Sequence, residues 1–335
     1  MCGFLVVGSS ELELQVFNDA LNQAAYRGPD HQHVSINNGI TWGFNRLSIM
    51  DLSSKGNQPF VYKDCVLVCN GEVYNYHSLK AMLETDYTFK SGSDCEVLIP
   101  LYHKYGIEIL CKFLDAEFAM VIYDAKKDKI LAARDPMGIR PMFYGYHKED
   151  GKICFASEAK GLFPLCQEIM PFPPGHYYED GKFICYNDLS NPKTINNDDL
   201  ETIAINLRLK LEKAVEKRLQ SDAPIGYLLS GGLDSSLVCA IAARLNDQPI
   251  KTFAIGMDTD PIDLKYAKQV ADYLGTDHTE VIMTKEDLLE NLRDVIFHLE
   301  TYDITTIRAS MAMYLLCKYI HENTDLKVIL TGEVS

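Results

Sequence analysis

The sequence is poor in positive charge and has no long apolar segment. Its 335 residues contain 32 Lys and Arg against 47 Asp and Glu, and no basic cluster interrupts the net charge of −15. We therefore expect no nucleic acid and no membrane surface as a partner. No apolar run approaches the ~18 residues of a membrane-spanning helix, and the first residues lack the basic region and the cleavage site of a signal peptide. These absences predict a cytoplasmic protein.

The cysteines are not spaced as a disulfide or zinc framework. There are ten of them, without a C-x-x-C pair, and the nine histidines include no H-E-x-x-H motif. This scatter predicts reduced, mostly buried thiols, as is typical of a cytosolic protein.

Two domains are expected, because one domain accounts for roughly 150 residues. Over residues 1–190 short β-type runs dominate, and residues 186–198 form the linker. Strands are predicted at 3–7, 40–45, 66–70, 117–124, 130–134, 142–146 and 153–156, and helices at 11–26, 76–84 and 94–105. This pattern indicates an α+β layer structure.

Beyond the linker, strands alternate with helices. Asp198 or Asp199 can cap a first helix, in which apolar residues recur every four positions from Ile203 to Leu219. Strands are predicted at 225–229, 251–255, 279–283 and 327–331, and helices at 235–245, 263–274, 286–299 and 307–321. The alternation predicts an α/β domain over residues 198–335, with a parallel sheet covered by helices on both faces.

Cys2 is a candidate nucleophile. Removal of Met1 would leave a thiol and a free α-amine on one residue, and an amine with a pKa near ~8 can accept the thiol proton. Considered alone, Cys2 is more simply explained as a small buried residue at the start of a strand.

Polar residues elsewhere in the first domain fit the same chemistry. The Asn70 amide and the Gly71 N–H could stabilise an oxyanion, although Asn-Gly is also a strong turn signal. Arg46 is suited to binding a carboxylate, and Glu72 with Asp94 could hold an ammonium group. The alternatives are a surface salt bridge for Arg46 and a helix N-cap for Asp94. Together these residues predict a pocket for an α-amino acid with an electrophilic side chain.

Five motifs, in this order, resemble the glutaminase domain of class II glutamine amidotransferases. They are Met1-Cys2-Gly3, Arg27-Gly28-Pro29-Asp30, Asn70-Gly71-Glu72 with Tyr74-Asn75, Ser91-Gly92-Ser93-Asp94, and Arg134-Asp135-Pro136-Met137-Gly138-Ile139-Arg140-Pro141. The resemblance implies an αββα sandwich of the N-terminal-nucleophile hydrolase type, with Cys2 as nucleophile and with Asn70 and Gly71 as the oxyanion hole. The glutamine-binding residues that it implies are Arg46, Leu47, Ser48, Ile49, Met50, Asn70, Gly71, Glu72 and Asp94.

A second motif opens the first strand–helix unit of the second domain. It reads Ser230-Gly231-Gly232-Leu233-Asp234-Ser235-Ser236, and its small residues let backbone N–H groups approach an anion at a helix N-terminus. A glycine-rich turn without a ligand is the alternative. The motif is similar to the pyrophosphate loop of ATP pyrophosphatases, which implies that Asp234 binds the Mg²⁺ bridging the phosphates.

The combination resembles glutamine-hydrolysing asparagine synthetases over essentially the whole chain. It implies that ammonia released from glutamine displaces AMP from β-aspartyl-AMP, which forms from aspartate and ATP. The ATP-binding residues that it implies are Leu229, Ser230, Gly231, Gly232, Leu233, Asp234, Ser235, Ser236, Ile255, Thr331 and Gly332. Glu333 would be the acid/base of that step. Glutamine, aspartate and ATP are thus the expected partners, Mg²⁺ the expected cofactor, and a homodimer the expected assembly.

The sequence departs from the family at its end. The family's second nucleotide loop continues past Gly-Glu as Gly-Ser-Asp-Glu, whereas Val334 follows Glu333 here. We therefore expect a family member truncated in its synthetase domain. The alternatives are a glutaminase alone, another class II amidotransferase, a β-lactam-forming relative, and a non-catalytic protein that binds glutamine or nucleotide. The loop at 230–236 argues against the second alternative, and Cys2 with Arg46 and Asp94 against the third.

Overall fold

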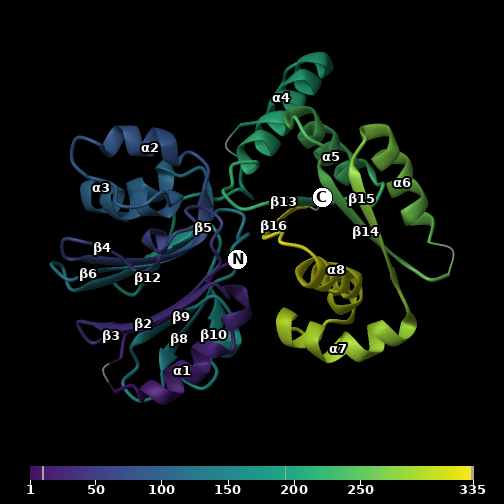
Figure 1. Cartoon of the computed structure of the whole chain (residues 1–335). Helices are drawn as coiled ribbons and strands as arrows, with labels where there is room; N and C mark the ends of the chain where they lie inside the picture. Colours follow the sequence, from purple (N-terminus) through teal and green to yellow (C-terminus); the bar gives the residue numbers. More distant parts are fainter. Residues whose placement is uncertain (10, 193, 260, 333–335) are drawn as a thin grey trace. The chain divides into compact units, whose positions relative to one another are not determined.

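Alternating apolar residues build two antiparallel sheets in the first unit, Met1–Ile195. The computed structural model describes residues 1–9, 11–192, 194–259 and 261–332 (Figure 1). In spatial order, the first sheet contains β10 (Cys166–Pro171), β8 (Phe143–His147), β9 (Ile153–Ala156), β1 (Gly3–Val7), β3 (Ile40–Arg46) and β2 (His31–Asn37). The second contains β12 (Lys182–Cys185), β11 (His176–Glu179), β7 (Lys129–Arg134), β6 (Ala116–Asp124), β5 (Cys65–Val73) and β4 (Phe60–Tyr62).

The two sheets stack face to face, and helices cover their outer faces (Figure 1). The helices are α1 (Leu14–Asn22), α2 (Tyr76–Leu83) and α3 (Leu98–Phe113), with 3-10 turns η1 (Ala25–Arg27), η2 (Ser54–Gly56), η3 (Asp94–Val97) and η4 (Ala159–Gly161). Trp42 and Phe155 lie in the core between the sheets. Phe17 of α1 packs on the first sheet, and Leu101 of α3 packs on the second. The predicted αββα sandwich is confirmed.

Strand β1, which begins one residue after Cys2, is central in the first sheet. It pairs with β3 on one side and β9 on the other, and all five of its residues are buried. Ser157 extends the second pairing, because its N–H donates to the Phe4 carbonyl (3.0 Å) and its Oγ accepts from the Phe4 N–H (3.0 Å). The start of the chain is therefore fixed from both sides.

A parallel four-stranded sheet forms the second unit, Asn196–Ser335. Its order is β15 (Asp277–Met283), β14 (Lys251–Met257), β13 (Ile225–Leu228) and β16 (Val328–Leu330). The helices are α4 (Leu200–Arg218), α5 (Leu233–Leu245), α6 (Ile262–Leu274), α7 (Lys285–Leu299) and α8 (Ile304–Asn323). Cys239 of α5 and Ala267 of α6 pack on one face, and Leu316 of α8 packs against Phe253 on the other. The predicted α/β domain is confirmed.

Three helices differ from the predictions. The first, predicted at 11–26, is limited to α1 (Leu14–Asn22) and is followed by the separate 3-10 turn η1. The helix predicted at 94–105 begins with the 3-10 turn η3, and α3 continues to Phe113 across a non-helical Gly106 (φ 79°). In α4 the four-residue spacing predicted one apolar face, but Val215 is its one buried residue, and Leu207 is 62% exposed.

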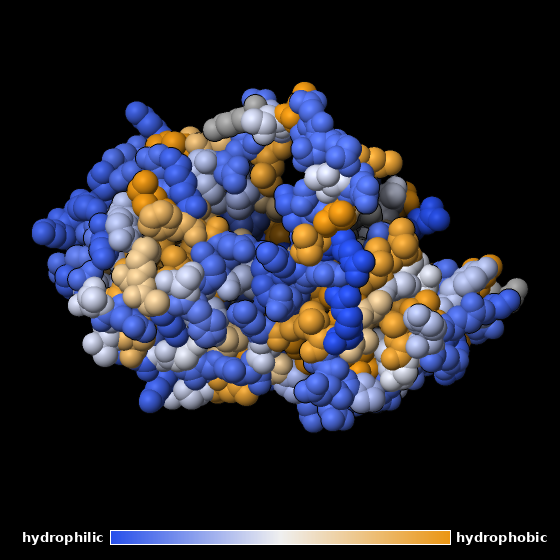
Figure 2. Space-filling view, turned by 90° about the horizontal axis from the view of Figure 1, so that it is seen from above, coloured by the Kyte–Doolittle hydropathy of each residue, from blue (hydrophilic) through white to orange (hydrophobic). Residues whose placement is uncertain are grey.

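Polar residues occupy most of the face drawn in Figure 2, and the thiols are mostly inside. Figure 2 shows a hydrophilic face with apolar residues in small patches. All ten cysteines are free and seven are buried, as predicted, whereas Cys185 and Cys317 are exposed. Among the described helices, none combines the length and the apolar character that crossing a bilayer requires.

Candidate active sites in the two units

Cys2 lies directly before β1 and contacts the loop that follows β3. Its Sγ accepts a hydrogen bond from the Leu47 N–H (3.4 Å) and donates to the Leu47 carbonyl (3.5 Å). The Arg27 Nε donates to the Cys2 carbonyl (2.9 Å). Burial raises the pKa of the Cys2 thiol, and the neighbouring amine opposes that rise. The thiol is therefore protonated at neutral pH and needs a base before it can attack.

The terminal amine beside Cys2 has the properties of such a base. Burial lowers the pKa of the Met1 amine to about 5; Cys2 opposes this, and the Arg27 and Arg140 guanidinium groups add to it. An amine with this pKa is unprotonated at neutral pH and can accept a proton. Here the amine belongs to Met1, one residue before the position that the sequence predicts for the processed chain.

Asn70 and Gly71 lie inside β5 rather than in a turn. They pair with Ala119 and Phe118 of β6, so the turn alternative is wrong. Asn70 is buried, and its Nδ2 has no hydrogen-bond partner among the described residues. Buried donors are nearly always paired, and an oxyanion would satisfy this one.

Two acidic side chains face each other next to Asn70 and Gly71. Asp94 is buried and accepts the Val73 N–H at 2.6 Å. Burial raises the pKa of Glu72 well above its usual range, the Asp94 carboxylate adds to this, and the Arg140 guanidinium opposes it. Burial also raises the pKa of Asp94. Because Asp94 lies within η3, the N-cap alternative does not hold. A bound ammonium group would relieve the repulsion within this pair.

Arg46 is buried and organises the loop that follows β3. Its Nη1 donates to the Ser53 carbonyl (2.6 Å) and to Asn57 Oδ1 (2.7 Å), and its Nη2 donates to the Met50 carbonyl (3.3 Å) and to the Asp51 carbonyl. Its partners in these bonds are uncharged oxygens, so the surface salt-bridge alternative is wrong. Binding a carboxylate through these nitrogens would require part of the loop to move.

The other residues predicted to bind glutamine lie on the same loop. They are Leu47, Ser48, Ile49 and Met50, which directly follow Arg46. The Ser48 N–H donates to Asp30 Oδ2 at 2.7 Å, which attaches this loop to the Arg27-Gly28-Pro29-Asp30 segment. Of these loop residues, Leu47 is the one that exchanges hydrogen bonds with Cys2.

Sequence reasoning gave no role to three charged residues of this site. Arg27 belongs to the motif at 27–30 and Arg140 to the motif at 134–141, so the sequence marked both positions without indicating a role. Arg140 is buried, and its Nη2 lies 3.5 Å from Glu117 Oε2. The sequence does not indicate that Glu117 belongs to this site, because Glu117 comes opposite Glu72 only when β5 pairs with β6.

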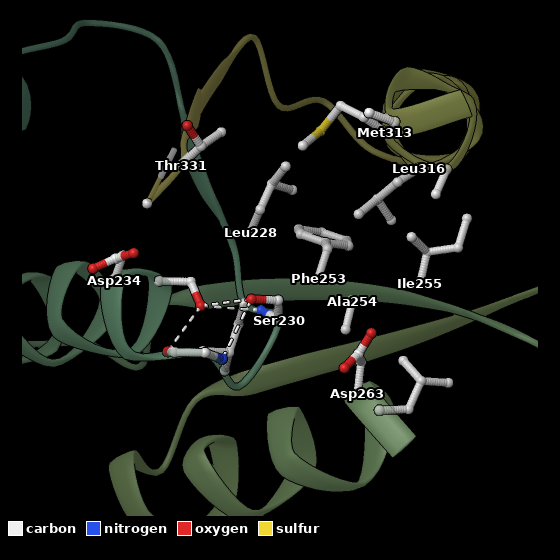
Figure 3. A pocket seen from close by; sticks show the side chains of 17 residues that line it. Leu228, Ser230, Asp234, Phe253, Ala254, Ile255, Asp263, Met313, Leu316 and Thr331 are labelled. Atoms are coloured by element: carbon white, nitrogen blue, oxygen red, sulfur yellow. Dashed lines mark hydrogen bonds between the residues drawn. The ribbon is translucent and has the colours of Figure 1, made fainter. Parts of the chain in front are cut away.

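In the second unit, a cavity of about 640 Å³ opens at the carboxyl ends of the strands (Figure 3). Its walls include eight residues predicted to bind ATP: Leu229, Ser230, Gly232, Asp234, Ser235, Ile255, Thr331 and Gly332. Gly231, Leu233 and Ser236 belong to the same loop without lining the cavity. Glu333 lies outside the described residues. Figure 3 shows Asp234 and Thr331 at one end, with Met313, Leu316 and Ile255 at the other. The cavity therefore has a polar end and an apolar end.

The polar end is the N-terminus of α5. Gly232 caps this helix without a side-chain hydrogen bond, so the first-turn N–H groups are available to an anion. Gly231 has φ +77°, and a Cβ there would lie 2.5 Å from the Ala267 nitrogen. A Cβ on Gly332 would lie 2.3 Å from the Ser235 nitrogen. Only glycine allows these close approaches.

At this end Asp234 offers a carboxylate to a divalent cation, whereas Figure 3 shows Asp263 on the other side of the cavity, beside Ala254 and Ile255. Asp234 is in the first turn of α5, and Asp263, in the first turn of α6, also lines the cavity. Carboxylate oxygens with phosphate oxygens are the ligands that Mg²⁺ prefers. Asp263 had appeared in the sequence resemblance without a role.

Comparison with known families covers both units. A glutamine amidotransferase domain matches residues 1–174, and asparagine synthase matches residues 206–335. The glutamine-hydrolysing asparagine synthetases of Zea mays and Mus musculus are each 40% identical to this chain over 100% of it. The glutamine-hydrolysing asparagine synthetase B of Escherichia coli is 41% identical over 92% of it. The chain spans 59%, 65% and 58% of the lengths of these three relatives.

Proposed function

Because this chain belongs to the glutamine amidotransferase domain family and continues into an asparagine synthase domain, we propose that it makes asparagine with nitrogen from glutamine. Residues 1–190 would be the glutaminase and residues 198–335 the ATP-binding synthetase domain. The observation that carries the proposal is the arrangement around Cys2: a thiol next to the start of the chain, an unpartnered Asn70 amide, and the half-buried Glu72 with the buried Asp94.

The first half-reaction would use the residues around Cys2. The Cys2 thiol passes its proton to the terminal amine and attacks the amide carbon of glutamine. Asn70 Nδ2 and the Gly71 N–H stabilise the oxyanion. Ammonia leaves with the transferred proton, and water then hydrolyses the thioester to glutamate. Glu72 and Asp94 hold the substrate ammonium group.

Substrate orientation would come from the loop after β3. Arg46 would bind the glutamine carboxylate once its bonds to the loop carbonyls are exchanged for it, and Leu47, Ser48, Ile49 and Met50 would flank the substrate. The exchange is favourable because a carboxylate is a stronger acceptor for a guanidinium than a neutral carbonyl is.

The second half-reaction would use the cavity of the second unit. The adenine would occupy the apolar end, next to Leu229 and Ile255, and the phosphates would lie at the N-terminus of α5, within the segment 230–236 and next to Thr331 and Gly332. Mg²⁺ held by Asp234 would neutralise phosphate charge. The β-carboxylate of aspartate attacks the α-phosphorus of ATP, which releases pyrophosphate, and ammonia then displaces AMP. Glu333 would serve as acid/base in this step.

One incubation with glutamine, aspartate and MgATP tests the proposal. We expect glutamate, AMP and asparagine in equal amounts. Cys2→Ala should abolish glutamate release and leave synthesis from an ammonium salt intact, whereas Cys185→Ala, at an exposed thiol, is the matched control. Glutamate without AMP would restrict the function to a glutaminase, and no glutamate would favour a glutamine-binding or nucleotide-binding protein.

Three further properties belong to the proposal. The family resemblance supports a cytoplasmic homodimer and a requirement for Mg²⁺.

Mass analysis of the N-terminus should find Cys2 first, since a retained Met1 would contradict the nucleophile assignment. Light scattering measures the assembly, and chelation of Mg²⁺ should stop AMP formation without stopping glutamate release.

A further inference from the structure

Glu158 directly follows the residue that extends the pairing of β1 with β9. Its neighbour Ser157 exchanges two hydrogen bonds with Phe4, so the chain at 157–158 runs alongside the chain at 2–4. Glu158 is buried, although it carries a charge and lies outside the residues to which the reaction assigns a role. A buried carboxylate is costly unless every oxygen is paired.

The Glu158 carboxylate is fully paired with donors from two segments. It accepts from the Tyr26 hydroxyl (2.6 and 2.7 Å to its two oxygens), from Arg27 Nη1 (2.9 Å) and from Lys160 Nζ (2.9 Å). Burial opposes ionisation, but the Tyr26 hydroxyl and the Arg27 and Lys160 charges outweigh it and lower the pKa of Glu158 below its usual value. The carboxylate is therefore ionised at neutral pH.

Arg27 connects this carboxylate to the nucleophile residue. Its Nη1 binds Glu158, and its Nε donates to the Cys2 carbonyl (2.9 Å). The strand backbone lies close to the Arg27 side chain, since a Cβ on Gly3 would be 3.3 Å from Arg27 Cδ. Arg27 Nη2 is buried and has no hydrogen-bond partner among the described residues. The orientation of this guanidinium thus depends on Glu158 at one edge and on Cys2 at the other.

We propose that Glu158 is a positioning residue for Cys2, which it holds in place by orienting Arg27 against the Cys2 carbonyl. The inference rests on the proposed glutaminase reaction. Glu158 touches no substrate in it, and its effect is to fix the backbone from which the thiol attacks. Misplacement of a reacting group by about 1 Å can lower a rate on the order of 10²-fold.

Glu158→Gln in the full-length protein tests this role. The amide keeps the shape but loses the charge that orients Arg27. We expect kcat for glutamate release to fall on the order of 10²-fold while KM for glutamine stays within about twofold, because the substrate-binding groups are unchanged. Arg27→Ala combined with Glu158→Gln should be no slower than Arg27→Ala alone, because Glu158 acts through Arg27.

Controls separate positioning from stability. Glu179→Gln removes a carboxylate from an ion pair with Lys129 on the same unit, and kcat should not change. Should Glu158→Gln fail to fold, Tyr26→Phe removes the hydroxyl that donates to Glu158 and accepts from Lys160, and it should lower kcat by about 3- to 10-fold.

The outcomes also distinguish this inference from the proposed function. A normal kcat in folded Glu158→Gln, a rise in KM in place of the fall in kcat, or additive losses in the double variant would overturn the positioning role alone. A wild-type protein that releases no glutamate would contradict the proposed function itself.

Discussion

At the scale of single residues, the Glu72–Asp94 pair of the proposed glutaminase site favours substrate binding at the expense of the stability of the empty protein. Asp94 is buried and Glu72 is half-buried, and burial raises the pKa of both. Ionising them without a cation is unfavourable, which is the condition that attracts the ammonium group of an amino acid. The same repulsion lowers the free energy of unfolding of the empty protein.

Glu72→Gln should therefore make the empty protein more stable and a weaker glutamine binder. We expect KM for glutamine to rise about 10- to 100-fold, since a charged hydrogen bond is lost. The folded-state pKa of Glu72 lies above the usual 4.5, so wild-type stability is lost as pH rises from about 4.5 through that folded-state pKa. The stability advantage of the variant should thus grow with pH over this range and reach roughly 1–3 kcal/mol.

Denaturant unfolding between pH 4 and pH 8, paired with glutamine kinetics, measures both effects. Glu84→Gln, at an exposed carboxylate of the same unit, provides the control. A stability difference that does not vary with pH would show that the Glu72 carboxylate is not under the strain described.

At the scale of elements, the proposed nucleotide site depends on two close approaches between segments. The backbone at Gly231 lies against Tyr266 and Ala267 in the second turn of α6, and the backbone at Gly332, after β16, lies against the first turn of α5. Side chains at either place would separate the loop from the elements that position it. Gly232, between Gly231 and α5, has more space, because the nearest atom to a Cβ there is Ser230 Oγ at 3.4 Å.

Gly231→Ala and Gly232→Ala should consequently differ. The first introduces a clash with Ala267, and it places alanine at a position whose φ is already positive. We expect it to cost about 1–3 kcal/mol of stability and most of the ATP affinity. The second should cost less, roughly 0.5–1 kcal/mol, because alanine is a poorer helix N-cap than glycine but meets no clash there. Calorimetric titration with MgATP and thermal unfolding compare the two, and equal losses would refute the steric argument.

How well the sequence predicts these elements depends on their place in the sheets. The buried inner strands β1, β3, β5, β6, β7, β8 and β9 were predicted within a few residues, because apolar residues fill them. The edge strands β2, β4, β10 and β12 were not predicted, and neither was β11, which lies next to β12. Edge strands are half exposed and form because a neighbour offers hydrogen bonds, which local composition does not record.

The candidate sites show the same division. Motif residues such as Cys2 and Asp234 could be found because their chemistry is unusual for their position. Asn70-Gly71 suggested a turn, yet pairing with β6 keeps these residues in a strand. The binding of Arg46 to its own loop and of Arg27 to Glu158 depends on segments brought together by folding. Short sequence patterns contain no information about such contacts.

At the scale of the whole molecule, each unit has its own hydrophobic core. The first is packed around two sheets and the second around one. Each proposed ligand also binds within a single unit. The chain should therefore respond to its two substrates separately when it is heated.

Calorimetry of the full chain tests this. MgATP at 100 times its Kd should raise the midpoint of one unfolding transition by roughly 5–10 °C. Glutamine added to the Cys2→Ala variant, which cannot hydrolyse it, should raise the midpoint of the other transition. One transition that shifts with both ligands would contradict the assignment of each ligand to its own unit.

The central position of β1 has a consequence for biosynthesis. Its partner β3 follows within 46 residues, but β9 ends at residue 156, so the ribosome completes the second partner much later. At about 5–20 residues per second, the interval between β1 and β9 is roughly 7–30 s. Until then Met1 projects from a strand that is paired on one side at most, where an aminopeptidase can reach it. Processing to the proposed nucleophile can thus begin before the sheet closes around β1, and because Met1 is still 47% exposed in the folded unit, it does not have to end when the sheet closes.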